Sequence, residues 1–579
     1  MILSRLPILL LSIGLFLLSA CHSTYTPNKS EVYGKTIPDD NQQVELARQA
    51  WEILSDNDQK NQWPSATQQY NKAVRIIFLR TRYEKYKTNN QLDFAKVRPY
   101  DIQRYNSKGT RDHNRYKDAI PCDLIDTTFR LEERVFVKGL GLPVAGVVKT
   151  DTNRSDKKVL KDSGNVNTLT AILDFGSTTN KKPILRIIPR LDTETIKIGN
   201  IDHPLAADFS APLAHFWEKN TALTDTALLG VFRPKETADF TGLYFSEPYN
   251  PNKIPVLLTH GLMSSPDTFC NLVNRLIVDP EIRHHYQFWY FSYPSGVPWV
   301  ISAKEQRDAL NAIIHEYDPH GTSPTLNNIV MVGHSMGGLI TRYNNASRPW
   351  GIIPQLMKNQ DAIAKMNYTQ AEKVQFGNNP AASKKIANTF IFNPYKQTSR
   401  IVFMSTPHQG SPIAESWIGF IGMKLIRLPE NIITEATRIA TLSRSMLLLN
   451  PKTLERSFTS IYQLSPNAPL IKGLQPLRPD KKIPVHSIIG NNGGWNHIFS
   501  SSDGVVPYSS SHLNWSQSED IVHSGHSVQD TIPAALALRK ILHEHLNQLK
   551  ISDPQHNCPP TIWQTNPPPR IVLPGYVGR

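Results

Sequence analysis

The chain has 579 residues and a formal net charge of +14, so it is long enough for one large domain and one or two smaller ones. The basic balance suits a protein near anionic lipid head groups, but ordinary surface charge explains it as well. No long run of Lys or Arg indicates a nucleic-acid site, and no C-x-x-C or H-E-x-x-H motif indicates a zinc site.

The N-terminal segment, residues 1–20, has the pattern of a secretory signal peptide. Arg5 precedes an apolar stretch from Leu6 to Leu18, which is too short to favour a membrane-spanning helix. The next residues, Leu18-Ser19-Ala20-Cys21, resemble a bacterial lipobox, in which the cysteine is acylated and becomes the new N-terminus. Ordinary cleavage without lipid attachment is the alternative. If Cys21 carries lipid, the histidine that follows it, in place of an aspartate, favours the outer membrane of a bacterial cell envelope.

Three regions lie between the N-terminal segment and residue 241. Residues 21–41 are polar and contain two prolines, so we expect a flexible tether. Residues 42–118 begin with apolar residues at helical spacing and continue with irregular sequence, which predicts an accessory region containing a helical hairpin. Residues 119–240 contain short apolar runs separated by turn residues, which predicts a small, sandwich-like β domain.

Residues 241–550 alternate apolar strands with helical segments, which predicts an α/β fold with a mostly parallel central sheet and helices on both faces. The expected strands include 254–259, 288–291, 329–332, 400–404 and 483–489. Two insertions, 347–398 and 413–470, interrupt the alternation and are expected to form caps, with packed decoration as the alternative. The Pro-rich tail, 551–579, is expected to be an extended strap or partly disordered.

The most informative motif is Gly333-His334-Ser335-Met336-Gly337, which lies between an apolar strand and a helix. This G-x-S-x-G pattern is typical of a nucleophile elbow, because the glycines allow a turn tight enough to present the serine hydroxyl at the start of the helix. A glycine-rich turn with an incidental serine is the alternative. We therefore expect Ser335 to be a catalytic nucleophile and the amide of Met336 to be one oxyanion donor.

A serine nucleophile needs a base, and the base needs an acid that orients it. Asp503 lies in a loop after an apolar strand and is the expected acid, although Asp-Gly is also a common turn pair. Glu519 and Asp520 are less favoured because they lie just ahead of the last short strand. His526 precedes the final helix and is the expected base, with His523 as the alternative.

The second oxyanion donor is expected in the His-Gly loop that follows the strand 254–259. Leu262 is the favoured donor and Met263 is the next choice. His260 and His334 are expected to have structural roles. His408 is expected to be a hydrogen-bonded loop histidine rather than a substrate contact.

Six segments, taken in chain order, resemble the motifs of α/β-hydrolase lipases and esterases: HGLMSSP, YFSYPSG, GHSMGG, STPHQGSP, SDGVVP and SGHS. Within that superfamily they are similar to bacterial lipoprotein hydrolases and to GPI inositol-deacylase-like lipases. The resemblance covers roughly residues 241–550 and implies a serine hydrolase that acts on acyl esters without a metal or cofactor. Together with the lipobox-like sequence at Cys21, it leads us to expect a membrane-anchored enzyme. The alternatives are an acyltransferase that uses the same residues and a non-catalytic surface lipoprotein that uses the fold for binding.

Three cysteines remain once Cys21 is set aside: Cys122, Cys270 and Cys558. In an oxidising compartment they allow one disulfide and one free thiol, and the sequence does not choose the pair.

The insertion at 413–470 carries Trp417, Phe420 and a cluster of leucines near Leu447. An apolar surface of this kind is costly when it is bare. We therefore expect the insertion to cap Ser335 and to favour hydrophobic acyl esters.

The lipid anchor is tested by Cys21→Ser. The variant lacks the thiol that accepts the acyl groups, so it should become soluble or accumulate unprocessed, because stable anchoring requires more than one acyl chain. Membrane fractionation and intact-mass measurement of both proteins give the result. A Cys21→Ser protein that stays in the membrane fraction in normally processed form contradicts the lipobox assignment.

Overall fold

The structure is a computed structural model, and it forms two compact units: residues 1–102, 173–185 and 198–201, and residues 103–172, 186–197 and 202–579. The described residues are 40–87, 101–104, 116–128, 130–148, 166–176, 182–190, 193–224, 226–356, 389–413, 462–493 and 495–550. The predicted signal, Cys21, most of the tether, most of both insertions, Cys558 and the Pro-rich tail lie outside these ranges. Within them, no helix combines the length and the apolar character needed to cross a membrane.

The first unit contains an α-helical hairpin made of α3 (Asp40–Ser55) and α4 (Trp63–Lys87), joined by the 3-10 helix η2 (Asn57–Gln62). Residues at helical spacing are the buried ones on both helices, for example Trp51 on α3 and Tyr70 on α4. The Tyr70 hydroxyl donates to the carbonyl of Leu173 at 2.7 Å and accepts from its amide at 2.8 Å. Trp51 packs on Phe175 with ring centroids 5.7 Å apart. A buried tyrosine with both hydrogen-bonding functions satisfied fixes the hairpin within its unit.

The strands before residue 240 form one five-stranded sheet in the order β1-β6-β5-β4-β2 and two two-stranded pairs, β3-β9 and β7-β8. Their bounds are β1 (Asp101–Arg104), β2 (Tyr116–Pro121), β3 (Phe136–Val137), β4 (Leu142–Val148), β5 (Val166–Asp174), β6 (Ile184–Pro189), β7 (Thr195–Ile198), β8 (Ile201–Pro204) and β9 (Ala207–Asp208). Strand β4 runs antiparallel to both β2 and β5. Three helices follow: α5 (Ser210–Lys219), α6 (Thr221–Thr224) and α7 (Thr226–Phe232).

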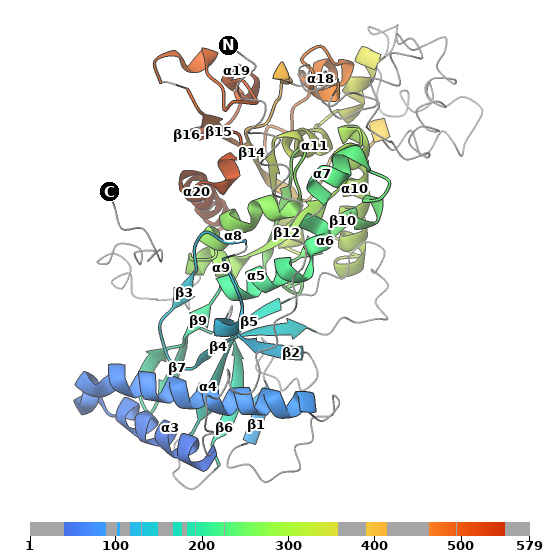
Figure 1. The fold of residues 1–579 in the computed structure, drawn as a ribbon. Helices are drawn as coiled ribbons and strands as arrows, with labels where there is room; N and C mark the ends of the chain where they lie inside the picture. The colour runs from blue at the N-terminus through green and yellow to red at the C-terminus, as the bar shows by residue number, and fades with distance from the viewer. Residues whose placement is uncertain are drawn as a thin grey trace, which may run out of the picture. The chain divides into compact units, whose positions relative to one another are not determined.

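The largest sheet has seven strands in the order β10-β12-β11-β13-β14-β15-β16 (Figure 1). The strands are β10 (Gly242–Phe245), β11 (Ile254–Thr259), β12 (Tyr286–Ser292), β13 (Ile329–His334), β14 (Thr398–Met404), β15 (Val485–Asn491) and β16 (Ser518–His523). Only β10 pairs antiparallel, with β12, and all the other pairings are parallel. The prediction of an α/β fold with a mostly parallel central sheet is therefore confirmed.

Helices cover both faces of this sheet, because successive side chains of each strand point to opposite sides. Leu257 and Met331 belong to one apolar cluster with residues of α10 and α11, whereas Val256 and Val330 belong to another with residues of α8 and α20. The helices are α8 (Cys270–Leu276), α9 (Pro280–His285), α10 (Trp299–Tyr317), α11 (Met336–Asn344), α18 (Pro469–Leu474), α19 (Tyr508–Ser511) and α20 (Ile532–Leu549). Cys122 and Cys270 lie in the second cluster as buried free thiols, so they do not form the disulfide with each other.

The register of the parallel strands brings the motif loops to one edge of the sheet. Thr259 at the end of β11 pairs with Gly333 of β13, which pairs with Phe403 of β14. At the far side, Asn491 of β15 pairs with His523 of β16. Since the carboxyl ends of parallel strands meet at the same edge, the loops after β11, β13, β14, β15 and β16 converge there.

A polar network anchors α20 to α9 away from that edge. Asp279 caps the N-terminus of α9 by accepting hydrogen bonds from the amides of Glu281 and Ile282. Its other carboxylate oxygen accepts from Arg539 at 2.5 Å and from His543 at 2.8 Å, both on α20. Burial alone would raise the pKa of Asp279, but the hydrogen bond from His543 and the charge of Arg539 prevail and lower it to about 2. The hydrogen bond from His543 to Asp279 raises the pKa of the histidine above its ordinary 6.5.

Asp279→Asn should keep the helix cap and remove the charge. The depressed carboxyl pKa contributes about 2 kcal/mol to the free energy of unfolding above its unfolded pKa, and this is lost as the pH falls toward 2. The raised histidine pKa contributes stability below 6.5 that is lost as the pH rises through its folded pKa. The stability difference between wild type and Asp279→Asn, measured by denaturant unfolding, should be largest between about pH 4 and 6.5. A difference that does not vary with pH contradicts this assignment.

Candidate active site

The turn between β13 and α11 holds Ser335 in a strained backbone conformation. Its φ and ψ angles are 52° and −124°, a region that residues with a side chain rarely adopt. The amide of Ser335 donates to the carbonyl of Met404 on β14 at 2.9 Å, so the neighbouring strand holds the turn in place. A Cβ on Gly333 would lie 2.6 Å from the carbonyl oxygen of Gly337, and one on Gly337 would overlap the carbonyl oxygen of Thr259. Glycine at both positions is therefore a steric requirement of the turn.

Three side chains from separate loops form one hydrogen-bonded chain at this turn. The Nε2 atom of His526 lies 2.9 Å from Oγ of Ser335, and its Nδ1 atom lies 2.7 Å from Oδ2 of Asp503. Because a carboxylate only accepts, Nδ1 carries the ring proton and Nε2 is left to accept from the serine hydroxyl. The side chain of Asp503 is 1% exposed and that of His526 is 21% exposed, and Ser335 is also buried, so the histidine is the most accessible of the three.

The loop after β15 supplies backbone hydrogen bonds that stabilise the ionised form of Asp503. Its Oδ1 atom accepts hydrogen bonds from the amides of Val505 at 2.8 Å and Val506 at 2.7 Å, while Oδ2 faces His526. Burial works to raise the pKa of Asp503, but the hydrogen bond and charge of His526 and the two amides together lower it. These contacts fix the orientation of the carboxylate and favour its ionised form.

The alternative acid and base residues are placed elsewhere. Glu519 accepts a hydrogen bond from the Tyr508 hydroxyl at 2.5 Å and pairs with Nδ1 of His512 at 2.7 Å. Asp520 lies within β16, and His523 ends that strand with an exposed side chain. Of the candidate acids and bases named from the sequence, the structure brings only Asp503 and His526 to Ser335.

Two backbone amides next to Ser335 are available to a ligand. Within the described part of the chain, no acceptor takes a hydrogen bond from the amide of Met336 or from that of Leu262. The turn that contains Leu262 passes directly beside the serine, since a Cβ on Gly261 would lie 2.8 Å from Cβ of Ser335. By contrast, the amide of Met263, the alternative donor, already donates to Oγ of Ser295 at 3.1 Å.

His260 stabilises the loop that carries Leu262, in agreement with the structural role expected from the sequence. Its ring stacks on Tyr293 with centroids 4.3 Å apart, and its Nδ1 donates to the carbonyl of Gly261 at 3.0 Å. The Tyr293 hydroxyl donates to the carbonyl of His260 at 2.7 Å. Burial lowers the pKa of His260 to about 4, so the ring is neutral at physiological pH.

His334 was expected to have a structural role, and its side chain binds the backbone of His526 directly. Its Nε2 donates to the backbone carbonyl of His526 at 2.9 Å, and the two rings lie 5.0 Å apart. Burial, followed by the neighbouring charge of His526, lowers the pKa of His334 to about 3, which keeps the ring neutral and its single N–H on the carbonyl. The residue before the serine therefore holds the backbone of the histidine.

His408 differs from its expected environment. The ring is 1% exposed and packs edge-on against Phe403 with centroids 4.6 Å apart. Neither ring nitrogen has a hydrogen-bond partner among the described residues, so the expected hydrogen-bonded loop histidine is not found. Within the same ranges, no group of three or more His, Cys, Asp or Glu side chains is arranged to hold a metal ion.

The strand order and the serine turn after the central strand resemble those of the α/β-hydrolase fold, which the sequence motifs also resembled. No protein-family model and no curated protein matches the chain. Among solved structures, the mature lipase of Bacillus licheniformis aligns with 51% of this chain and 97% of its own, at 15% identity and a TM-score of 0.29. The Staphylococcus hyicus lipase aligns with 52% and 96%, at 13% identity and 0.30. A metagenomic carboxyl esterase aligns with 52% and 78%, at 12% identity and 0.29.

Gly337→Ala tests the steric requirement of the turn. The new methyl group would overlap backbone, which has nowhere to move, so the free energy of unfolding should fall by about 3 kcal/mol or more. Gly525→Ala is the matched control, because a Cβ there meets nothing closer than the carbonyl of Asp503 at 3.7 Å. Thermal unfolding of wild type and both variants gives their relative stabilities. Equal stability of the two variants contradicts the packing described for the turn.

Proposed function

We propose that this protein is a serine hydrolase that cleaves acyl esters. The observation that carries the proposal is the continuous hydrogen-bonded chain from Asp503 through His526 to Ser335, with the serine held in a strained turn at the start of α11. A serine hydroxyl is a poor nucleophile unless a base takes its proton, and this arrangement supplies the base and the group that orients it.

The proposed reaction has two halves. In the first, Oγ of Ser335 attacks the acyl carbon as its proton passes to Nε2 of His526, and the developing oxyanion is stabilised by the amides of Leu262 and Met336. The bond to the alcohol then breaks, and His526 returns the proton to the leaving oxygen. In the second half, His526 takes a proton from water as the water oxygen attacks the acyl carbon. The bond between the acyl carbon and Oγ of Ser335 then breaks, His526 returns the proton to Oγ, and the acid is released. Asp503 holds the imidazole and stabilises its charged form throughout.

The proposed setting is the bacterial cell envelope, with the chain tethered through lipid on Cys21 and the outer membrane favoured. The lipobox-like sequence before Cys21 supports this location. We further propose a preference for hydrophobic acyl groups. The partly buried side chain of Leu262 packs against the apolar cluster beneath α10 and α11, and the apolar residues of the insertion at 413–470 favour the same substrate class.

The catalytic assignment is tested by turnover of a short-chain chromogenic ester. Ser335→Ala and His526→Ala should each lower kcat by roughly four or more orders of magnitude, because removal of either partner disables the same proton transfer. Asp503→Asn should be severe but milder, since it mainly misorients the imidazole. His523→Ala, which alters an exposed histidine three residues from His526, is the control and should keep normal activity.

Two outcomes would change the account. Full activity in His526→Ala with loss in His523→Ala inverts the assignment of the base, and turnover by Ser335→Ala removes the serine mechanism. Product analysis with added alcohol separates hydrolysis from acyl transfer, because transfer replaces the free acid with a new ester.

A further inference from the structure

The turn that follows His526 is hydrogen-bonded to α8 and to η6 (Pro266–Phe269), the 3-10 helix that precedes α8. This turn, η12 (Val528–Asp530), begins two residues after His526. Thr268 accepts a hydrogen bond from Gln529 at 2.7 Å, Asn271 donates to the carboxylate of Asp530 at 2.8 Å, and Arg275 donates to the Asp530 carbonyl at 2.6 Å. Asn271 and Arg275 lie four residues apart and therefore share one face of α8.

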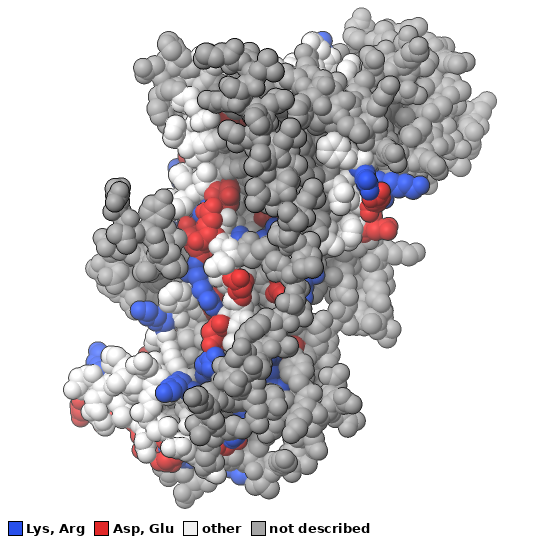
Figure 2. Space-filling view, in the orientation of Figure 1, with Lys and Arg blue, Asp and Glu red and all other residues white. Residues whose placement is uncertain are grey.

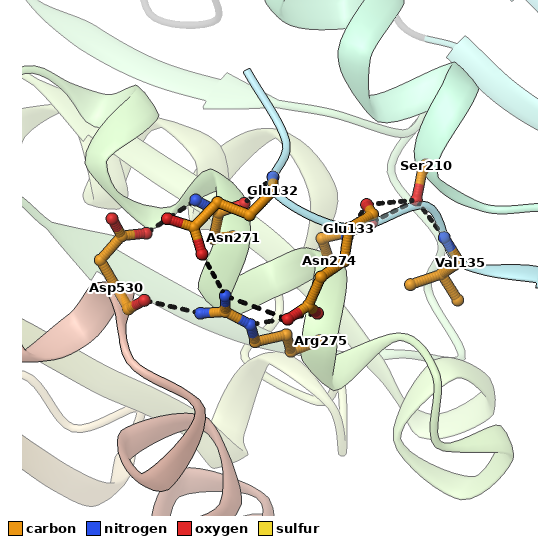
Figure 3. Close-up of polar contacts among 8 residues, drawn as sticks. All are labelled: Glu132, Glu133, Val135, Ser210, Asn271, Asn274, Arg275 and Asp530. Atoms are coloured by element: carbon orange, nitrogen blue, oxygen red, sulfur yellow. Dashed lines mark hydrogen bonds and ion pairs between the residues drawn. The ribbon is translucent and has the colours of Figure 1, made fainter. Parts of the chain in front are cut away.

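Asn271 and Arg275 of α8 also bind the segment Glu132–Glu133, which precedes the large sheet in the chain (Figure 3). Asn271 accepts from the amide of Glu132 at 3.0 Å with its carbonyl oxygen, so one amide group bridges the segment and η12. Arg275 donates to the carboxylate of Glu132 at 2.7 Å and to both oxygens of Glu133 at 3.3 Å. Every nitrogen of the guanidinium therefore has an acceptor, either in the segment or in η12.

Burial and charge make this bridge rigid. The side chains of Arg275 and Glu133 are each 9% exposed, and Asn274 fixes the backbone by donating to the Glu133 carbonyl at 3.0 Å. Side chains of both charges gather over α8 and α9 on the face seen in Figure 2. Burial, together with the charge of Glu132, raises the pKa of Asp530 against the opposing effects of Asn271 and Arg275. Arg275 thus joins the carboxylates of Glu132 and Glu133 to the backbone carbonyl of Asp530.

We propose that Asn271 and Arg275 are positioning residues for His526, and that the Glu132–Glu133 segment fixes both of them. This inference rests on the proposed hydrolase function. His334 holds the carbonyl of His526 and α8 holds Asp530, so the loop that carries the imidazole is fixed at two points. A displacement of about 1 Å at a catalytic group lowers the rate on the order of a hundred-fold. Loss of the contacts between α8 and Asp530 should therefore let His526 shift and lower the rate of the reaction.

The test compares kcat and KM of the mature protein and its variants on a short-chain ester. The concentration of active sites is measured by complete labelling with a fluorophosphonate. Arg275→Met and Asn271→Ala should each lower kcat per labelled site by roughly ten- to a hundred-fold, with KM within about two-fold of wild type. Glu133→Gln, which keeps the shape of the side chain, should lower kcat by a few-fold, and Arg275→Lys should recover part of the loss.

Arg283→Met is the matched control. Arg283 is also buried, pairs with Glu194 at 2.6 Å and donates to two carbonyls near the end of α8, but it does not contact η12. This variant should lose thermal stability and keep kcat per labelled site.

The inference is overturned if Arg275→Met and Asn271→Ala merely lower the melting temperature and keep wild-type kcat per labelled site. If Arg275→Met does not fold, Asn271→Ala and Glu133→Gln decide by the same criterion. Failure of the underlying function is distinguishable, because wild type would then resist the fluorophosphonate and either turn over no ester or turn it over no faster than Ser335→Ala.

Discussion

The hydrogen bond between Ser335 and His526 joins positions 191 residues apart, and the rest of the structure is arranged so that this bond forms. Neither residue can reach the other by local folding. Ser335 depends on a turn that only glycines permit, and His526 depends on a loop that leaves the last strand of the sheet. The parallel register between β13, β14, β15 and β16 sets the distance between the two, because each strand delivers its loop to the same edge.

The electrostatics of the site follow from the same placement. Asp503 is nearly fully buried, yet its oxygens accept from two amides and the imidazole, so its charge is retained where an isolated carboxylate would be protonated. The nearby histidines His260 and His334 are kept neutral by burial and serve as hydrogen-bond donors. Among these three, only His526 contacts both a buried carboxylate and the hydroxyl of Ser335, so it is the histidine to which we assign a chemical role.

Local sequence was sufficient for features whose cause is local. The apolar runs predicted β11 and β14, and the glycine spacing predicted the turn at Ser335. Both features restrict the residue types of a short segment, so they can be recognised in the local sequence. Ser335, Asp503 and His526 were assigned from short motifs, and the structure brings them together, while their chemical roles stay a prediction. Strand β10 was not anticipated, since four residues that pair antiparallel at a sheet edge carry little periodicity. The contact of His334 with the His526 carbonyl and the bridge through Arg275 depend on long-range packing, which a sequence pattern does not encode.

The central claim is that Ser335 is the activated nucleophile, and covalent mapping tests it most directly. Wild-type protein is treated with a fluorophosphonate, digested and analysed by mass spectrometry, beside His526→Ala. The account predicts one adduct, on the peptide that contains Ser335, formed at a rate that falls by several orders of magnitude when the base is removed. An adduct on another residue, or labelling of Ser335 at an unchanged rate in His526→Ala, would contradict it.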